Sequence, residues 1–253
     1  MELLTQNLPS GYPYPFPSIR VVPMTFAQIL EYSENLPSSE VERYYFDYVV
    51  VKADDERVDQ LLLPDLEYVI FFKKGLTIAR DVTFDSTVTC PECGNDVKVH
   101  FSLGQVKFNH LDSEMSKVFN LEVGGSLHPV KIPTVAEFMN IFAKYRRFKK
   151  VSDMKMIKLI ALFMGAPQYL NRYEDLVVKA TYEDITVLTM AYQLCYEIVE
   201  PLTVYCPECN KGVSTDQQRG MVVEIQSLTT SFFRVIIENN RLTSSKIIFG
   251  EIQ

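Results

Sequence analysis

The sequence contains the stretch Cys90-Pro91-Glu92-Cys93 and repeats it, far along the chain, as Cys206-Pro207-Glu208-Cys209. Each stretch is a tight turn that directs two thiolates to one point, and two such turns supply the four sulfurs of a closed tetrahedral Zn²⁺ site. Local zinc ribbons separate their two pairs by roughly 15–20 residues. A metal shared by these two pairs would therefore join distant parts of the chain and determine the fold. The predicted ligands of this single structural Zn²⁺ are Cys90, Cys93, Cys206 and Cys209.

Other interpretations of the cysteines remain open. The two pairs could form two incomplete sites, each completed by histidine, or they could be redox dithiols. Redox pairs of the thioredoxin type open a helix, whereas Gly94-Asn95-Asp96 and Asn210-Lys211-Gly212 indicate turns into strands. The chain begins without a basic and apolar leader, so disulfides are not expected. A four-cysteine site has no open position for water, and Cys195, in an apolar helical run, is predicted to be a small buried hydrophobic residue.

Composition limits the possible classes of function. The chain has 253 residues, of which 47% are hydrophobic and 23% are charged, which is enough apolar sequence for a substantial core. Its net charge of −7 argues against nonspecific binding to nucleic acid, which depends on a basic surface. No apolar run approaches the roughly 20 residues of a membrane span. We expect a soluble protein with a protein partner.

The first part of the chain is rich in proline and aromatic residues. Residues 8–23 contain five prolines, which fix φ and remove backbone donors, so this segment is predicted to be extended. Tyr12, Tyr14 and Phe16 alternate along it, which places three rings on one side. These rings could pack against the protein's own core or into a groove of a neighbour. We predict that they bind a partner.

Periodicity predicts an α+β protein in which a helical block is inserted between two halves of a zinc-clasped β unit. Thr25 is a plausible N-cap, and the acidic cluster from Asp54 to Asp59 is predicted to be a solvated turn. Residues 66–72 favour a helix. Strand residues 97–101 are expected to pair with 106–108, and further helices are expected at 154–164, 169–179 and 181–200. The predicted divisions are an extended arm at 1–25, a mainly helical region at 26–82, the first β half at 83–132, the helical insertion at 133–201 and the second β half at 202–253.

Several motifs carry a resemblance to a known family. Leu8-Pro9-Ser10-Gly11, an aromatic at Tyr12 or Tyr14, and Ile19-Arg20-Val21-Val22-Pro23-Met24-Thr25 resemble the start of the baseplate hub proteins of T4-like and other contractile-tailed bacteriophages. That family opens with an L-P-S arm, then I-x-V-R-P-M-T and a helix. Its C-P-x-C-G motif before a hairpin is similar to Cys90-Pro91-Glu92-Cys93-Gly94 with Phe101-Ser102-Leu103, and the start of its helical block is similar to Pro133-Thr134. Val22 departs from the family pattern, which has Arg there.

The resemblance implies a non-enzymatic structural or assembly protein of the baseplate hub. Its partners would be other phage tail and baseplate proteins, in the virion or in the host cytoplasm during assembly, with no membrane or small-molecule substrate. Three scattered histidines support no Ser/His/Asp or Cys/His arrangement, so no catalytic residue is assigned. The alternative is a zinc-ribbon regulatory protein that binds nucleic acid. Only Lys98, Lys107 and Lys211 lie near the cysteine pairs in the sequence, which disfavours it.

Overall fold

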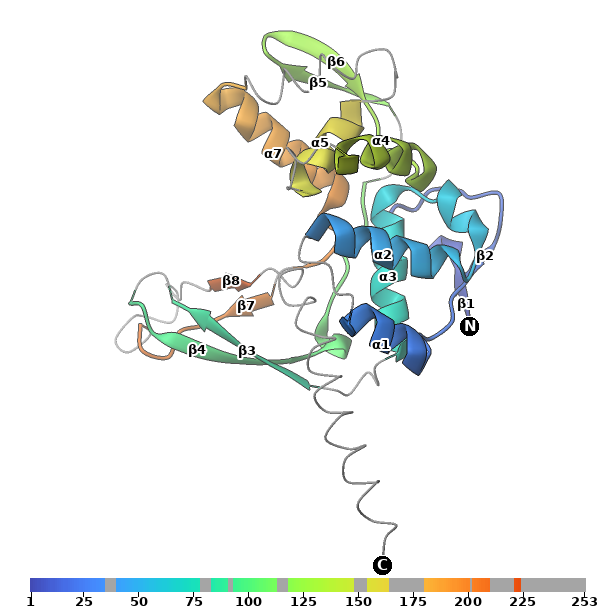
Figure 1. Ribbon diagram of the computed structural model, residues 1–253. Coiled ribbons are helices and arrows are strands. Elements are labelled where there is room, and N and C mark those ends of the chain that lie inside the picture. The colour runs from blue at the N-terminus through green and yellow to red at the C-terminus, as the bar shows by residue number, and fades with distance from the viewer. Residues whose placement is uncertain are drawn as a thin grey trace, which may run out of the picture. The chain divides into compact units, whose positions relative to one another are not determined.

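The computed structural model describes residues 1–34, 40–77, 83–90, 93–112, 118–147, 154–163, 180–200, 202–209 and 221–223 (Figure 1). The chain forms two compact units, each discontinuous in sequence. Unit 1 comprises Met1–Pro23, Leu36–Lys74 and Phe108–Ile198, and unit 2 comprises Met24–Asn35, Gly75–Lys107 and Val199–Gln253. Helices and small antiparallel sheets occur together, which confirms the α+β class. The chain passes from one unit to the other after residues 23, 35, 74, 107 and 198.

Unit 1 is mainly helical. Its elements are β1 (Glu2–Leu4), η1 (Thr5–Asn7), β2 (Ser18–Arg20), α2 (Glu40–Lys52), η2 (Glu56–Gln60), α3 (Leu63–Thr77), β5 (Phe119–Val123), β6 (Ser126–Val130), α4 (Val135–Arg147), α5 (Met154–Phe163) and α7 (Tyr182–Tyr196). The last residues of α3, from Gly75 on, belong to unit 2. Among the described residues, no helix is both long enough and apolar enough to cross a membrane.

Helix α3 confirms the helix predicted at 66–72 and is buried on more than one side. Leu66 and Val69 are fully buried, and so are charged side chains along the same helix. Lys74 Nζ lies 2.7 Å from Asp47 Oδ2 on α2. An unpaired buried charge is costly. This ion pair therefore fixes which part of α2 packs against Lys74 on α3.

The N-terminal segment is folded onto unit 1 and is not a projecting arm. Strand β1 pairs antiparallel with β2, placing Leu3 opposite Ile19. The backbone N–H of Thr5 donates to Pro17 O over 2.9 Å, and Leu8 and Ile19 are fully buried. The prolines lie mostly in the connection between the strands, where a missing N–H interrupts no ladder. The prediction of an extended arm at 1–25 is therefore wrong for its first part, which belongs to the core of unit 1.

The aromatic rings of this segment follow one another on one side, as predicted. The ring centroids of Tyr12 and Tyr14 are 5.0 Å apart, and those of Tyr14 and Phe16 are 5.4 Å apart. Their exposure differs, however, because Phe16 is 8% exposed and Tyr12 is 39% exposed. The inner end of the row is part of the core, and the outer end faces solvent.

Tyr14 joins this row to the start of α3. Its hydroxyl donates to Asp65 Oδ2 over 2.5 Å and accepts from the Leu62 N–H over 2.8 Å. Ser10 donates to the same carboxylate through both its N–H and its hydroxyl. Burial raises the pKa of Asp65, and these donors partly offset that effect. Burial and the nearby Asp65 raise the pKa of Tyr14, so its hydroxyl keeps its proton as a donor.

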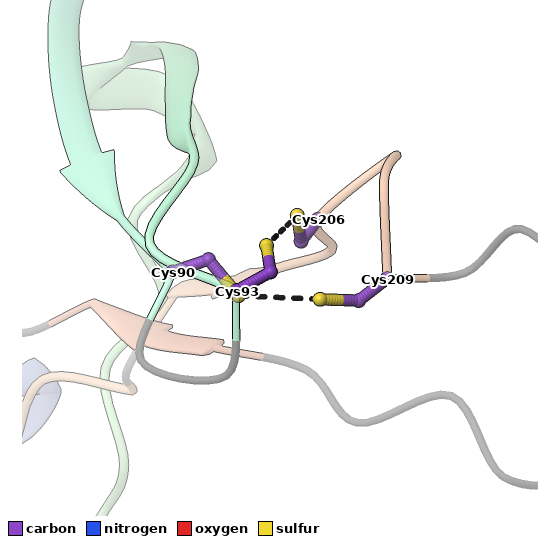
Figure 2. Close-up of side chains that lie close together, drawn as sticks. All are labelled: Cys90, Cys93, Cys206 and Cys209. Carbon is purple, nitrogen blue, oxygen red and sulfur yellow. Dashed lines mark hydrogen bonds between the residues drawn. The ribbon is translucent and has the colours of Figure 1, made fainter.

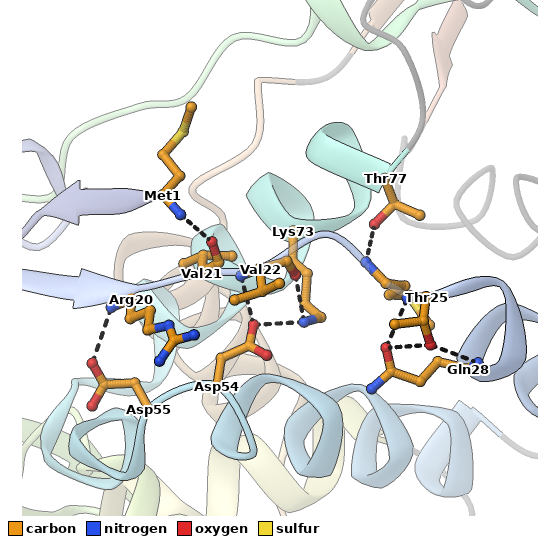
Figure 3. A network of polar contacts seen from close by, with 11 residues as sticks. Met1, Arg20, Val21, Val22, Thr25, Gln28, Asp54, Asp55, Lys73 and Thr77 are labelled. Carbon is orange, nitrogen blue, oxygen red and sulfur yellow. Dashed lines mark hydrogen bonds and ion pairs between the residues drawn. The ribbon is translucent and has the colours of Figure 1, made fainter.

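The acidic cluster that follows α2 is not a solvated turn. Asp54 Oδ2 accepts from the Val22 N–H over 2.8 Å and from Lys73 Nζ over 2.5 Å, and Lys73 Nζ also donates to Val22 O over 2.6 Å (Figure 3). Asp55 accepts from the Arg20 N–H over 3.0 Å. Hydrogen bonds, first from the Arg57 side chain, lower the pKa of Asp55 to about 2. These carboxylates hold residues 20–22 in place, which corrects the prediction.

The third stretch of unit 1 contains the predicted helices and one hairpin that the sequence did not indicate. Strands β5 and β6 pair through Gly124 and Gly125, whose φ angles of 61° and 70° are typical of a two-glycine turn. Figure 1 shows this hairpin beside α5 and α7. Thr181 and Asp184 form the expected capping box at the start of α7. The helix predicted at 169–179 lies outside the described residues.

Unit 2 contains α1 (Phe26–Glu34), β3 (Thr83–Thr89), β4 (Asp96–Ser102), η3 (Leu103–Gln105), β7 (Leu202–Val204) and β8 (Met221–Val223). Thr25 caps α1 as predicted, because its hydroxyl accepts from the Gln28 N–H over 3.2 Å while Gln28 Oε1 accepts from the Thr25 N–H. Strand β4 pairs with β3, so the predicted pairing of 97–101 with 106–108 is wrong. The strand predicted near 221 is confirmed for Met221–Val223, and the predicted element from Ser231 lies outside the described residues.

Substituting Tyr14 by Phe removes the hydroxyl that serves both Asp65 and Leu62. We expect the free energy of unfolding to fall by about 1–3 kcal/mol, because a buried donor loses its acceptor and a buried carboxyl loses a donor. Tyr12→Phe is the matched control and should change it by less than about 0.5 kcal/mol, since that ring is partly exposed. Urea unfolding of both variants gives the comparison, and equal effects would contradict this role for Tyr14.

Candidate metal centre

Two antiparallel hairpins present the two cysteine pairs, both in unit 2. Strand β3 ends at Thr89, directly before Cys90, and Thr89 lies opposite Asp96, the first residue of β4. The Thr89 hydroxyl donates to Asp96 Oδ1 over 2.8 Å. The second pair follows β7 after one intervening residue, Tyr205, and Val204 lies opposite Met221 at the start of β8. Each cysteine pair thus lies in the connection between two paired strands.

The first turn has the geometry of a tight knuckle. The Cys90 N–H donates to Asn95 O over 2.8 Å, and the Gly94 N–H donates back to Cys90 O over 2.9 Å. Gly94 has a φ of 72°, a conformation that side chains with Cβ rarely adopt. Because this turn reverses the chain so sharply, the strand after it pairs with the strand before it. This explains why β4 pairs with β3 and not with residues 106–108.

The four sulfurs meet at one point, as the sequence predicts. Cys90 Sγ lies 3.7 Å from Cys209 Sγ, and Cys93 Sγ lies 3.6 Å from Cys206 Sγ (Figure 2). All four sulfur atoms are within 4.8 Å of one another. Each short contact joins one knuckle to the other, so the group is a single cluster and not two separate pairs.

The spacing fits a metal ion and does not fit disulfides. A disulfide needs an S–S distance of about 2.05 Å. Tetrahedral sulfurs about 2.3 Å from a central ion lie about 3.8 Å apart, close to the two distances found. Hydrogen bonding with the neighbouring Cys93 and Cys90 thiols raises the pKa of Cys209, and a positive charge at the centre of the cluster would favour the thiolate instead. The four cysteines lie close enough to one another to hold a metal ion.

The cluster has a buried side and an open side. Cys90 and Cys206 are 3% and 2% exposed and pack with Val97, which is also buried. Cys209 packs against this small apolar cluster and is half-buried, whereas Cys93 is exposed. The strand residue Val97 therefore helps to position the cysteines, a role that the sequence pattern did not single out.

The other candidate residues lie elsewhere. Cys195, on α7, is fully buried as predicted, and burial raises its pKa to about 12. His100 is on the exposed side of β4, and His128 is buried with Nε2 3.3 Å from Val123 O. Within the residues that the structure describes, the four cysteines form the one group of three or more potential metal ligands. Tyr12, Tyr14 and Phe16 belong to unit 1 and form the row described above.

Comparisons with protein-family models, with curated proteins and with solved structures find no match to this chain.

Replacing Cys206 by Ser should weaken metal binding and destabilise unit 2. Loss of a structural metal belongs to the few changes that cost more than about 4 kcal/mol. The control is Cys195→Ser, which buries one hydroxyl, should cost about 1–3 kcal/mol and should leave the metal bound. Thermal melts with metal analysis of each variant test this. If both variants melt alike and keep their metal, the four-cysteine centre has no part in stability.

Proposed function

We propose that the four-cysteine centre holds one structural Zn²⁺ per chain. Four thiolates in tetrahedral arrangement are typical of structural zinc, and they leave no coordination position for water or a substrate. The observation that supports this is the convergence of the four sulfurs, each knuckle contributing two. When bound, the ion supplies the positive charge that lets all four thiols ionise. Through the ion, the four cysteines would hold the two hairpins next to each other.

Such an ion would join two segments that the chain separates widely. In the sequence, residues 108–198 of unit 1 separate the last two of the three stretches that form unit 2. Within unit 2, the Glu200 N–H donates to Lys107 O over 2.9 Å, and within unit 1 the Asn109 N–H donates to Ile198 O over 2.7 Å. The bond from Glu200 joins two separate stretches of unit 2, whereas the bond from Asn109 joins the two ends of one continuous stretch of unit 1. The zinc ion would add a second link between these two stretches of unit 2.

We further propose that the protein is a non-enzymatic structural or assembly protein of a contractile phage tail baseplate, in its hub region. Two features support this proposal. The zinc centre is closed, which suits a role in shape and not in chemistry. The N-terminal motif from Leu8 to Thr25 resembles the opening of baseplate hub proteins. The protein would hold other tail and baseplate proteins in register.

The contact with those partners is proposed to involve the outer end of the aromatic row. Tyr12 is the most exposed of the three rings. Tyr14 and Phe16 hold it in position from the buried side of the row, since Phe16 is buried and Tyr14 is hydrogen-bonded to Asp65. Exposed aromatic residues held in a fixed position are frequent anchors of protein interfaces. Tyr12 is therefore the predicted partner contact, with Tyr14 and Phe16 positioning it.

The metal can be identified directly. Protein purified under reducing conditions should contain one zinc ion per chain by elemental analysis, because all four ligands serve a single site. Two ions per chain would indicate two separate sites completed by other residues. No metal, or iron in place of zinc, would contradict the proposed centre.

The partner contact is tested with Tyr12→Ala. The variant should keep the wild-type melting temperature and zinc content, yet its association with assembled tails should weaken about tenfold or more, as for truncated anchor residues. The measurement is the amount of tagged protein that copurifies with tails. Tyr182→Ala is the control, because Tyr182 is a tyrosine on α7 that is 84% exposed. Unimpaired association of Tyr12→Ala, or an equal loss in both variants, would contradict the proposed contact.

A further inference from the structure

The two knuckles expose their cysteines in the same asymmetric way. The first cysteine of each knuckle, Cys90 or Cys206, is buried. The second cysteine is more accessible, because Cys209 is half-buried and Cys93 is exposed. The four ligands are therefore two inner sulfurs and two outer sulfurs, with one of each kind from each hairpin.

Local structure explains the asymmetry. Cys90 and Cys206 pack with Val97 in one apolar cluster, and the Cys90 backbone is bonded to Asn95 O. The other end of the first knuckle is open. A Cβ placed on Gly94, directly after Cys93, would meet no heavy atom within 4 Å. A small reagent can therefore approach Cys93 from solvent, whereas neighbouring atoms shield the inner sulfurs.

The sulfur contacts connect the outer sulfurs to the inner ones. Cys93 Sγ is 3.6 Å from Cys206 Sγ, and Cys209 Sγ is 3.7 Å from Cys90 Sγ (Figure 2). If an outer sulfur leaves the metal, three sulfurs from both knuckles still hold it. The hairpins then remain joined while one coordination position is free.

We infer that the metal is exchanged through the outer edge formed by Cys93 and Cys209, by substitution with a small thiolate ligand, and that Cys93 is the first ligand to leave. In this step a bond forms between the metal and the incoming sulfur while the bond to Cys93 Sγ breaks. The charge on the metal does not change, and the freed Cys93 thiolate takes a proton from water. The inference rests on the proposed zinc centre and makes that centre a site of controlled metal exchange.

The experiment uses the metal-loaded wild-type protein. Iodoacetamide alkylates free thiolates, forming an S–C bond with loss of iodide, and peptide mass spectrometry follows each cysteine with time. We expect Cys93 to react at least tenfold faster than Cys90 and Cys206, with Cys209 second. Cys195 is an internal control for unfolding, since it is fully buried in unit 1 and should react last. A chromophoric chelator in parallel samples should show that added glutathione accelerates metal release.

The outcomes separate the inference from the proposal on which it rests. Metal analysis before labelling shows whether the centre is loaded, and absence of metal would overturn the zinc centre together with the exchange edge. If metal is present but Cys90 or Cys206 reacts as fast as Cys93, the exchange edge alone is wrong. Simultaneous reaction of all five cysteines would show that the metal is released only by unfolding. Unchanged metal release in glutathione would likewise overturn substitution by thiolate.

A second arm uses Cys93→Ser and Cys90→Ser, which remove one sulfur each from the same knuckle. Cys93→Ser lacks the first ligand to leave, so glutathione should accelerate its metal release less than twofold. Cys90→Ser keeps the outer edge, so the acceleration should persist. If glutathione accelerates release from Cys93→Ser as strongly as from the wild type, Cys93 is not the first ligand to leave. If either variant does not retain metal, the order in which the cysteines of the wild-type protein are alkylated decides whether Cys93 is the first ligand to leave.

Discussion

The strongest constraint on this protein is that four cysteine sulfurs from two distant hairpins occupy one small volume. Four thiolates within 4.8 Å of one another would repel, so the proposed metal would couple the local structure to metal binding. This coupling has a topological consequence. Unit 2 is built from three separated stretches, and residues 108–198 are folded into unit 1 between the last two. The metal-binding group joins two of these stretches where the chain itself does not.

The sequence predicted this centre because its signal is local and repeated. A Cys-x-x-Cys turn needs only a few residues to set its geometry, and the Gly94 conformation completes it. Helix caps at Thr25 and Thr181 were predictable for the same reason, since the capping partners lie three residues away. The partner of β4 was predicted wrongly because alternating apolar residues precede and follow it. The tight turn of the knuckle makes β4 pair with the preceding strand β3. The alternation of apolar residues alone does not show which neighbour β4 pairs with.

The roles of the acidic residues depend on partners far away in sequence. Asp54 and Asp55 are sequence neighbours that resemble a surface turn, yet they bind the backbone of Val22 and Arg20, more than thirty residues earlier. Asp65 follows Pro64 and resembles a helix-start residue, but its donors are Ser10 and Tyr14. Neither set of contacts can be predicted from the spacing of hydrophobic residues in the sequence. Buried carboxylates need donors, and the N-terminal segment supplies them, which is why that segment folds onto the protein.

The same contacts explain how a segment can be part of the core and still expose Tyr12, the proposed partner contact. Phe16 is buried with the Arg57 guanidinium 5.4 Å from its ring centre, and Arg57 is held by Asp55. Tyr14 stacks on Phe16 and is fixed by Asp65, so Tyr12 rests on a row of side chains that cannot easily move. Ordering an exposed aromatic before binding lowers the entropy cost of association. An anchor fixed in this way, on a protein whose proposed metal has no reactive position, suits a component that holds other proteins in register.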